Sequence, residues 1–95
     1  MKQPAVYILA KKRNGTLYTG VTSNLVKRTA EHKSHAIPGF TRTYGVDRLV
    51  WFEAHPTMES AIRREKAIKE WRRAWKLALI EKANPCWNDL FDSIV

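Results

Sequence analysis

The feature that most constrains the fold is an apolar run, followed by a polar turn and a second short segment. The run Ala5–Ala10 contains β-branched and aromatic residues, which is typical of a buried β-strand. The polar stretch Lys11–Thr16 comes next and contains Asn14-Gly15, a dipeptide that favours turns. Leu17–Val21 is then expected to return alongside the first strand. This pattern predicts a β-hairpin at the start of the chain.

Further elements follow the hairpin in an order typical of an α/β protein. Polar residues 22–24 supply N-cap candidates for a helix over Leu25–Lys33. Ser34–Tyr44 contains a Pro-Gly pair and is expected to be a loop. Arg48–Ala54 predicts a third strand, apolar enough at its centre to be covered on both faces.

The second half of the chain is predicted to be largely helical. Met58–Ala83 contains neither Gly nor Pro, which fits one long helix or two helices with a break near residues 71–74. Asn84-Pro85 ends this region, because the residue before a proline disfavours helical geometry. The tail 86–95 keeps apolar residues and is expected to pack. We therefore predict a single α/β domain over residues 1–95: a three-stranded, largely antiparallel sheet that begins with a hairpin and is covered by about three helices.

The chain is strongly basic for its 95 residues, with a formal net charge of +8. Residues 1–48 carry nine Lys or Arg against two acids, whereas residues 49–95 are nearly neutral. Such concentration of cations indicates a nucleic-acid partner more readily than a solvated surface. The lone cysteine, Cys86, excludes an internal disulfide, and no apolar run is long enough to span a bilayer. We expect a cytoplasmic protein with no membrane partner.

Two tyrosines and a glycine in the hairpin form the first candidate site. Tyr7 and Tyr18 can share one face of the two strands, although a strict two-residue turn would pair Tyr18 with Lys11. The phenols therefore meet only if the loop is wider or bulged. Gly20, on the face of Tyr18, leaves room for a close approach to the backbone. The alternative is that both tyrosines are half-buried core.

Arg28 and His32 lie four residues apart, so they are neighbours on one face of the first predicted helix. A guanidinium suits phosphate binding, and an imidazole suits proton transfer near neutral pH. A solvated helix face explains the same pair equally well.

Glu65 is the most informative residue, because it is an acid on an apolar helix face. The apolar residues that share this face are Met58, Ala61, Ile62 and Ile68. A buried carboxylate is costly unless it is paired, hydrogen-bonded or bound to a metal. Mg²⁺ suits one carboxylate completed by waters and a substrate phosphate, whereas an ion pair to a neighbouring Arg is the structural alternative. The four tryptophans, at positions 51, 71, 75 and 87, are expected to build the core, with base stacking by Trp71 and Trp75 as the alternative.

Taken in order, these residues resemble the motifs of the GIY-YIG nuclease domain. The matching residues are Val6-Tyr7, Tyr18-Thr19-Gly20, Arg28, His32, Glu65 and Asn88. The stretches Gly39–Tyr44, Arg64–Lys69 and Asn84–Leu90 look characteristic of small stand-alone bacterial members, which are similar to the nuclease domain of a bacterial excinuclease. Ala5 stands where the first motif has its glycine, and no functional side chain is lost. The family also implies two helices within residues 58–83.

The resemblance implies metal-dependent hydrolysis of phosphodiester bonds in DNA, in repair or processing. By position, Glu65 would bind Mg²⁺ or Mn²⁺, and Arg28 would balance charge on the phosphoryl oxygens. Tyr7 and Tyr18 would position the attacking water, one of them acting as base with help from His32. Asn88 would orient a neighbouring group, and the expected phosphate contacts are Lys11, Lys12, Arg13 and Arg42. A partner protein supplying specificity is one expectation, and a binding module with little turnover is the alternative function.

Overall fold

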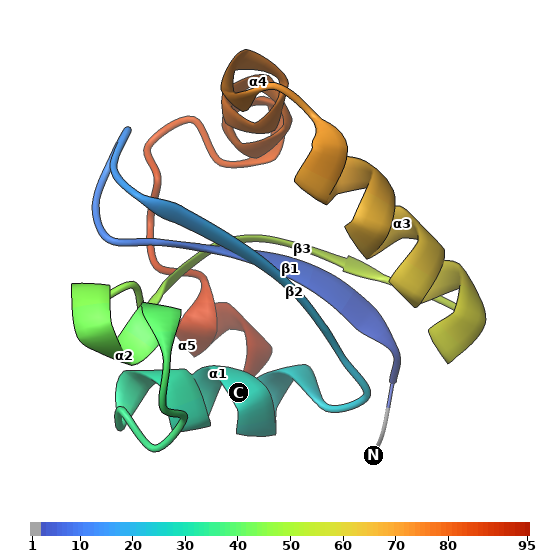
Figure 1. Cartoon of the computed structure of the whole chain (residues 1–95), viewed down its shortest axis with the longest axis horizontal. Coiled ribbons are helices and arrows are strands. Elements are labelled where there is room, and N and C mark those ends of the chain that lie inside the picture. The colour runs from blue at the N-terminus through green and yellow to red at the C-terminus, as the bar shows by residue number, and fades with distance from the viewer. Residues whose placement is uncertain (1–2) are drawn as a thin grey trace.

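The computed structural model describes residues 3–95 and contains a three-stranded antiparallel sheet in the order β2-β1-β3 (Figure 1). The strands are β1, Ala5–Ala10, β2, Leu17–Thr22, and β3, Arg48–Ala54. All six residues of β1 are buried, as expected of a central strand. The predicted hairpin and third strand are therefore confirmed, and β2 runs one residue further than predicted. Both β2 and β3 are edge strands, and β2 is the edge strand that carries Tyr18 and Gly20.

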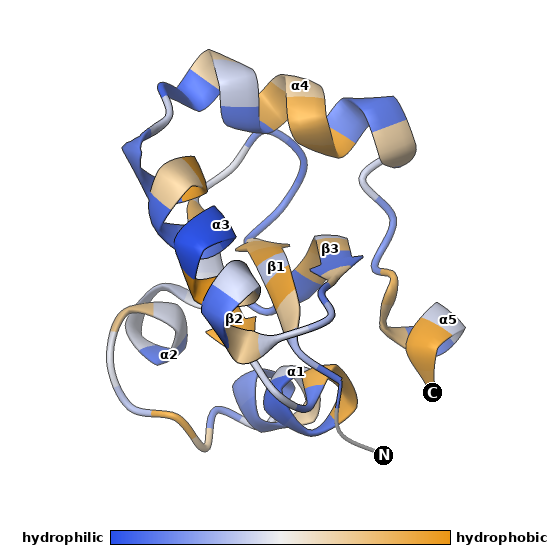
Figure 2. Ribbon diagram, turned by 90° about the vertical axis from the view of Figure 1, so that its right-hand side faces the viewer, coloured by the Kyte–Doolittle hydropathy of each residue, from blue (hydrophilic) through white to orange (hydrophobic). Residues whose placement is uncertain are grey.

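Helices cover both faces of the sheet, and the alternation of side chains along β1 divides the core between them. The helices α3, Met58–Glu70, and α4, Arg73–Ala83, lie on one face, where Val6 and Ile8 are buried (Figure 1). The other three lie on the opposite face, where Tyr7 and Leu9 are buried. They are α1, Leu25–Lys33, α2, Phe40–Tyr44, and α5, Phe91–Ile94. Figure 2 shows the sheet edge-on between the two layers.

The predicted fold is confirmed, and two short helices add to the three longer ones that cover the sheet. The predicted loop at residues 34–44 ends in α2, and the tail contains α5. Gly39 and Gly45 flank α2 with φ of 115° and 65°, so Gly45 ends it in the left-handed conformation that glycine adopts without strain. Glycines that favour a loop by residue type thus mark the two ends of a short helix here.

The helical region 58–83 consists of two helices, as the family resemblance implies. Trp71 and Arg72 adopt extended geometry between α3 and α4. Trp75, in the first turn of α4, is 52% exposed. The prediction that all four tryptophans build the core is therefore wrong for Trp75, whereas Trp51 and Trp87 are buried.

The turn after α4 is held by a buried asparagine that the sequence did not single out. The Asn84 side-chain amide donates to the Val50 carbonyl at 3.0 Å and to the Asn88 carbonyl at 2.9 Å. Its side-chain oxygen accepts from the Asn88 backbone N–H at 3.1 Å. These bonds tie the turn to β3, and they place the fully buried Trp87 against the core.

Replacing Asn84 with Ala should lower the free energy of unfolding by about 1–3 kcal/mol, because it leaves buried backbone groups without partners. Asn88→Ala is the matched control, since Asn88 takes part through its backbone alone, and should change stability by no more than about 0.5 kcal/mol. Urea unfolding measures both. Equal losses in the two variants would contradict this role for Asn84.

Candidate active site

The site begins where the Tyr7 side chain crosses the edge strand over Gly20. Tyr7 and Gly20 are direct partners in the antiparallel ladder, and Leu9 pairs with Tyr18. The loop at residues 11–16 is therefore wider than a two-residue turn, which is the condition for the two phenols to meet. A Cβ added at Gly20 would lie 2.5 Å from both Cζ and Oη of Tyr7. Only glycine leaves this path open.

Helix α1 brings His32 to the phenol of Tyr7. Asn24 caps the helix, its side-chain oxygen accepting from the Lys27 backbone N–H at 3.1 Å, as predicted for residues 22–24. His32 is buried, and its Nε2 lies 3.1 Å from Tyr7 Oη. Its Nδ1 lies 3.0 Å from Oγ1 of Thr41, at the second position of α2. Both ring nitrogens of His32 are thus within hydrogen-bonding distance of a hydroxyl group.

Tyr18 completes an aromatic cluster around the same histidine. Its ring centroid is 5.6 Å from that of His32 and 6.4 Å from that of Tyr7. Phe40, the first residue of α2, stacks on the outer side of Tyr18 with centroids 6.4 Å apart. The structure therefore brings Tyr7, Tyr18 and His32 together, as the sequence predicts.

The pKa values of this cluster follow from burial and neighbouring charges. Burial, and after it the neighbouring Tyr18, raises the pKa of Tyr7 above its ordinary value of 10.0; Glu65 adds to this, and Arg28 opposes it. Burial, followed by the positive charge of Arg28, lowers the pKa of His32 below 6.5. At neutral pH Tyr7 is thus protonated and His32 is neutral, so one can donate and the other accept.

Arg28 sits at the exposed side of this cluster. It lies 3.8 Å from the Glu31 carboxylate and lines a polar cavity of about 200 Å³ with residues near the end of β2. Its side chain is 43% exposed, so the guanidinium is accessible to a ligand. This exposure fits both a phosphate-binding role and a solvated helix face for the Arg28–His32 pair.

Glu65 approaches from the opposite helical layer. It lies in the middle of α3, a helix that packs on β1 and β2, and it is only 8% exposed between the fully buried Ala61 and Ile68. Glu65 therefore lies on the buried face of α3 with Ala61 and Ile68, as predicted, whereas Met58 and Ile62 of the predicted face are exposed. Its Oε2 pairs with Nζ of Lys69 at 2.7 Å, so the ion-pair partner is a lysine one turn away and not an arginine.

The donor set around Glu65 fits a metal bound through a single carboxylate. Within residues 3–95, no group of three or more His, Cys, Asp or Glu residues is arranged to hold an ion. An all-protein cage is thus absent from the described chain, but Mg²⁺ commonly uses one or two carboxylates, waters and substrate phosphates. The Glu65 side chain is 11% exposed, so solvent still reaches it.

The other predicted residues lie outside this cluster. Asn88 is exposed in the turn after α4, where its backbone groups bond to Asn84. Lys11, Lys12 and Arg13 are exposed in the hairpin loop, and Arg42 is exposed on α2. The hairpin loop also leans toward α4, because Arg73 donates to the carbonyls of Asn14 and Gly15 at 2.7 Å.

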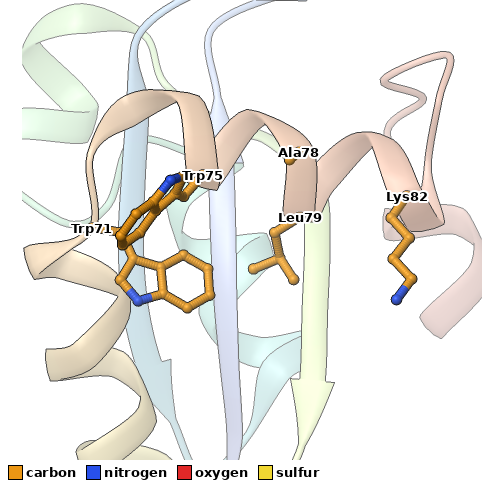
Figure 3. Close-up of a pocket in the computed structure, with 5 residues that line it drawn as sticks. All are labelled: Trp71, Trp75, Ala78, Leu79 and Lys82. Atoms are coloured by element: carbon orange, nitrogen blue, oxygen red, sulfur yellow. The ribbon is translucent and has the colours of Figure 1, made fainter.

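Two depressions flank the crossing of Tyr7 over β2. One is the polar cavity at Arg28, which begins at Thr22. The other, of about 340 Å³, is lined by aromatic and basic side chains together with β2, and its residues are Leu17, Tyr18, Thr19, Phe40, Lys69 and Lys76. We call the second the Tyr18 groove. A separate apolar pocket of about 450 Å³ lies along α4, and none of the cluster residues lines it (Figure 3).

Thr41, Lys69 and Phe40 lie beside the predicted site residues, and the sequence gives them no individual role, although they belong to the stretches Gly39–Tyr44 and Arg64–Lys69 that resemble the family. Thr41 and Phe40 lie in a stretch that is predicted to be a loop, where no helical periodicity indicates which side chains face the core. Lys69 stands four residues after Glu65, a spacing at which opposite charges on a helix meet, so this signal was available.

Gly20→Ala should displace the Tyr7 phenol and lower the free energy of unfolding by about 1–3 kcal/mol, because the new Cβ collides with the ring. The measurement is urea unfolding of Gly20→Ala in the natural chain and in a Tyr7→Leu background. The cost should largely vanish in the second, where the far end of the ring is gone. An undiminished cost there would count against the close approach as its cause.

Protein stability should fall as the pH drops below about 6.5, in part through His32. Its pKa is lowered in the folded state, so the unfolded chain binds more protons there, and acid favours unfolding. The contribution cannot exceed about 1.4 kcal/mol per pH unit for one proton. Unfolding free energies at pH 7.5 and 5.5 should differ less in His32→Gln than in the natural chain; an unchanged difference would exclude His32 as a contributor.

Comparisons with known proteins agree with this architecture. The family model described as the GIY-YIG catalytic domain matches residues 3–78. A UPF0213 protein of Clostridium perfringens is 43% identical over 75 residues, covering 79% of this chain and 80% of that protein. A UPF0213 protein of Syntrophus aciditrophicus is 40% identical over 86 residues, covering 90% and 97% respectively.

A solved structure gives the same result. The solution NMR structure of a UPF0213 protein from Bacillus halodurans has a TM-score of 0.57 and 32% sequence identity to this chain, and the match covers 92% of each. In the described residues, no helix is both long and apolar enough to cross a membrane. Sequence, fold and the arrangement of the motif residues thus agree: the chain belongs to the GIY-YIG catalytic domain family, among the small UPF0213 proteins.

Proposed function

We propose that this protein is a metal-dependent endonuclease that hydrolyses phosphodiester bonds in DNA, in repair or processing. Family membership supports a nuclease-like function and a nucleic-acid substrate. The observation that carries the proposal is the buried Glu65 carboxylate on α3, a helix that packs on the strands of Tyr7 and Tyr18, and its charge raises the pKa of the Tyr7 phenol that lies beside His32. A protein that only binds nucleic acid has no need of this acid on an apolar helix face.

Proton transfer is assigned to Tyr7 and His32. We assign the Tyr7 hydroxyl as donor to Nε2 of His32, 3.1 Å away, and Nδ1–H of His32 as donor to the Thr41 hydroxyl, 3.0 Å away. With this tautomer, the phenol can pass its proton to the histidine as it takes one from the attacking water. Tyr18, half-buried and lining its groove, is assigned to positioning that water. Thr41 acts through His32 and is a positioning residue.

Glu65 is assigned as the protein ligand of Mg²⁺ or Mn²⁺. A divalent ion held there would polarise the scissile phosphate, stabilise the leaving oxygen and favour the Tyr7 phenolate. The exposed guanidinium of Arg28 offers two parallel N–H donors to the phosphoryl oxygens, where negative charge grows during the reaction.

The DNA backbone is proposed to run along the edge strand β2, across both depressions. Lys11, Lys12, Arg13 and Arg42 are exposed and would add phosphate contacts away from the chemistry. Asn88 is proposed to orient a neighbouring group from the turn after α4. The strongly basic N-terminal half supports a polyanionic partner. We further propose that a second protein supplies specificity and that the protein is located in the cytoplasm.

Glu65→Gln should reduce DNA cleavage in Mg²⁺ by at least about 100-fold without weakening DNA binding by more than about threefold, because the metal's role is lost while the basic surface, with Lys69 freed from its ion pair, is kept. Plasmid nicking with and without EDTA, alongside a gel shift, measures both. Glu59→Gln is the matched control, since Glu59 lies on the same helix with a side chain that is 83% exposed. Undiminished cleavage by Glu65→Gln would rule out this site. DNA binding without cleavage by the natural protein would favour the binding-module alternative.

A further inference from the structure

Lys69 makes a contact that the proposed chemistry does not use. Its ammonium lies 2.7 Å from Oε2 of Glu65, the carboxylate assigned to the metal. We propose that Lys69 is a displaceable internal cation: it neutralises Glu65 while no metal is bound, leaves when a divalent ion binds, and then meets a substrate phosphate in the Tyr18 groove. This inference rests on the proposed function, because it takes Glu65 as the ligand.

The need for such a cation comes from burial. Glu65 is 8% exposed between apolar neighbours, and an unpaired carboxylate is costly in that environment. Lys69 supplies the missing charge from one helical turn away. A divalent ion on the same carboxylate would provide this compensation itself and repel the ammonium, so both cannot occupy the position at once.

The Lys69 ammonium can dissociate from Glu65 because few contacts hold it in place. Its side chain is 49% exposed, and among the described residues Glu65 is its ion-pair partner. Lys33 shows the contrasting arrangement, because its ammonium is bound to the Asp89 carboxylate and also donates to the Asp47 carbonyl at 3.2 Å. Lys69 lacks such a second anchor within residues 3–95, and a long flexible stem carries its charge.

The Tyr18 groove gives the displaced ammonium a place to act. Lys69 lines this groove together with Lys76, Tyr18 and Phe40. Two ammonium groups beside aromatic surface match the phosphates and bases of a nucleic-acid strand. The same lysine thus links the proposed metal position to the adjacent substrate path.

The first test measures binding of Mn²⁺ alone, by titration calorimetry or electron paramagnetic resonance. Lys69→Gln should bind Mn²⁺ about three- to tenfold more tightly than the natural protein, because the competing cation is gone. Lys66→Gln is the matched control: it removes an equal charge from an exposed position on the same helix, and should stay within about twofold. Thermal unfolding by circular dichroism verifies that each variant is folded.

The outcomes separate the two proposals. Equal or weaker Mn²⁺ binding by Lys69→Gln, with binding still dependent on Glu65, overturns the role of Lys69 alone. If Glu65→Gln binds Mn²⁺ as the natural protein does, or no protein binds it, the ligand assignment and the proposed function fail together.

The second test uses a fluorescent DNA oligonucleotide, first without metal and then with Ca²⁺ in place of the catalytic ion. Lys69→Gln should weaken DNA binding in Ca²⁺ by about three- to fivefold more than it does without metal, because only a released ammonium can reach a phosphate. An equal effect under the two conditions would exclude the transfer of Lys69 to the substrate.

Discussion

The close passage of the Tyr7 side chain over Gly20 is the interaction on which the site depends. It carries a phenol from the buried central strand to the edge of the sheet, where His32 and Tyr18 can reach it. The position of α1 and α2 follows from this meeting point, because His32 bridges Tyr7 on one side and Thr41 on the other. A side chain at position 20 would close the path, whatever the surrounding helices did.

Much of the frame and the centre of the site could be predicted from local chemistry. The bounds of β1, α1 and β3 match the prediction because apolar runs, an asparagine cap and hydrophobic periodicity are encoded within each segment. Glu65 could be singled out because a single acid interrupts an otherwise apolar helix face. The meeting of Tyr7 and Tyr18 was conditional on a wide hairpin loop, and the register of β1 with β2 supplies that condition.

The remaining features depend on contacts between distant segments. A helix of five residues such as α2 is too short to be stable from its own propensity, so its packing beside Tyr18 determines it. Trp75 has an apolar side chain that predicts burial, but it lies on the exposed side of α4, in contact with Trp71 and Arg72. Thr41 carries no pattern of its own, and its importance comes from the imidazole it holds.

The two layers contribute different halves of the candidate site, and this has a consequence for how the site is assembled. The tyrosine–histidine half belongs to the sheet and the α1–α2 layer, whereas Glu65 arrives on α3 from the other side. Partial opening of the α3 layer would therefore detach the acid and leave the aromatic half intact. Under the proposed function, ordered assembly of the whole fold would itself be a safeguard, since a nascent or partly folded chain would carry no complete centre with which to cut nucleic acid.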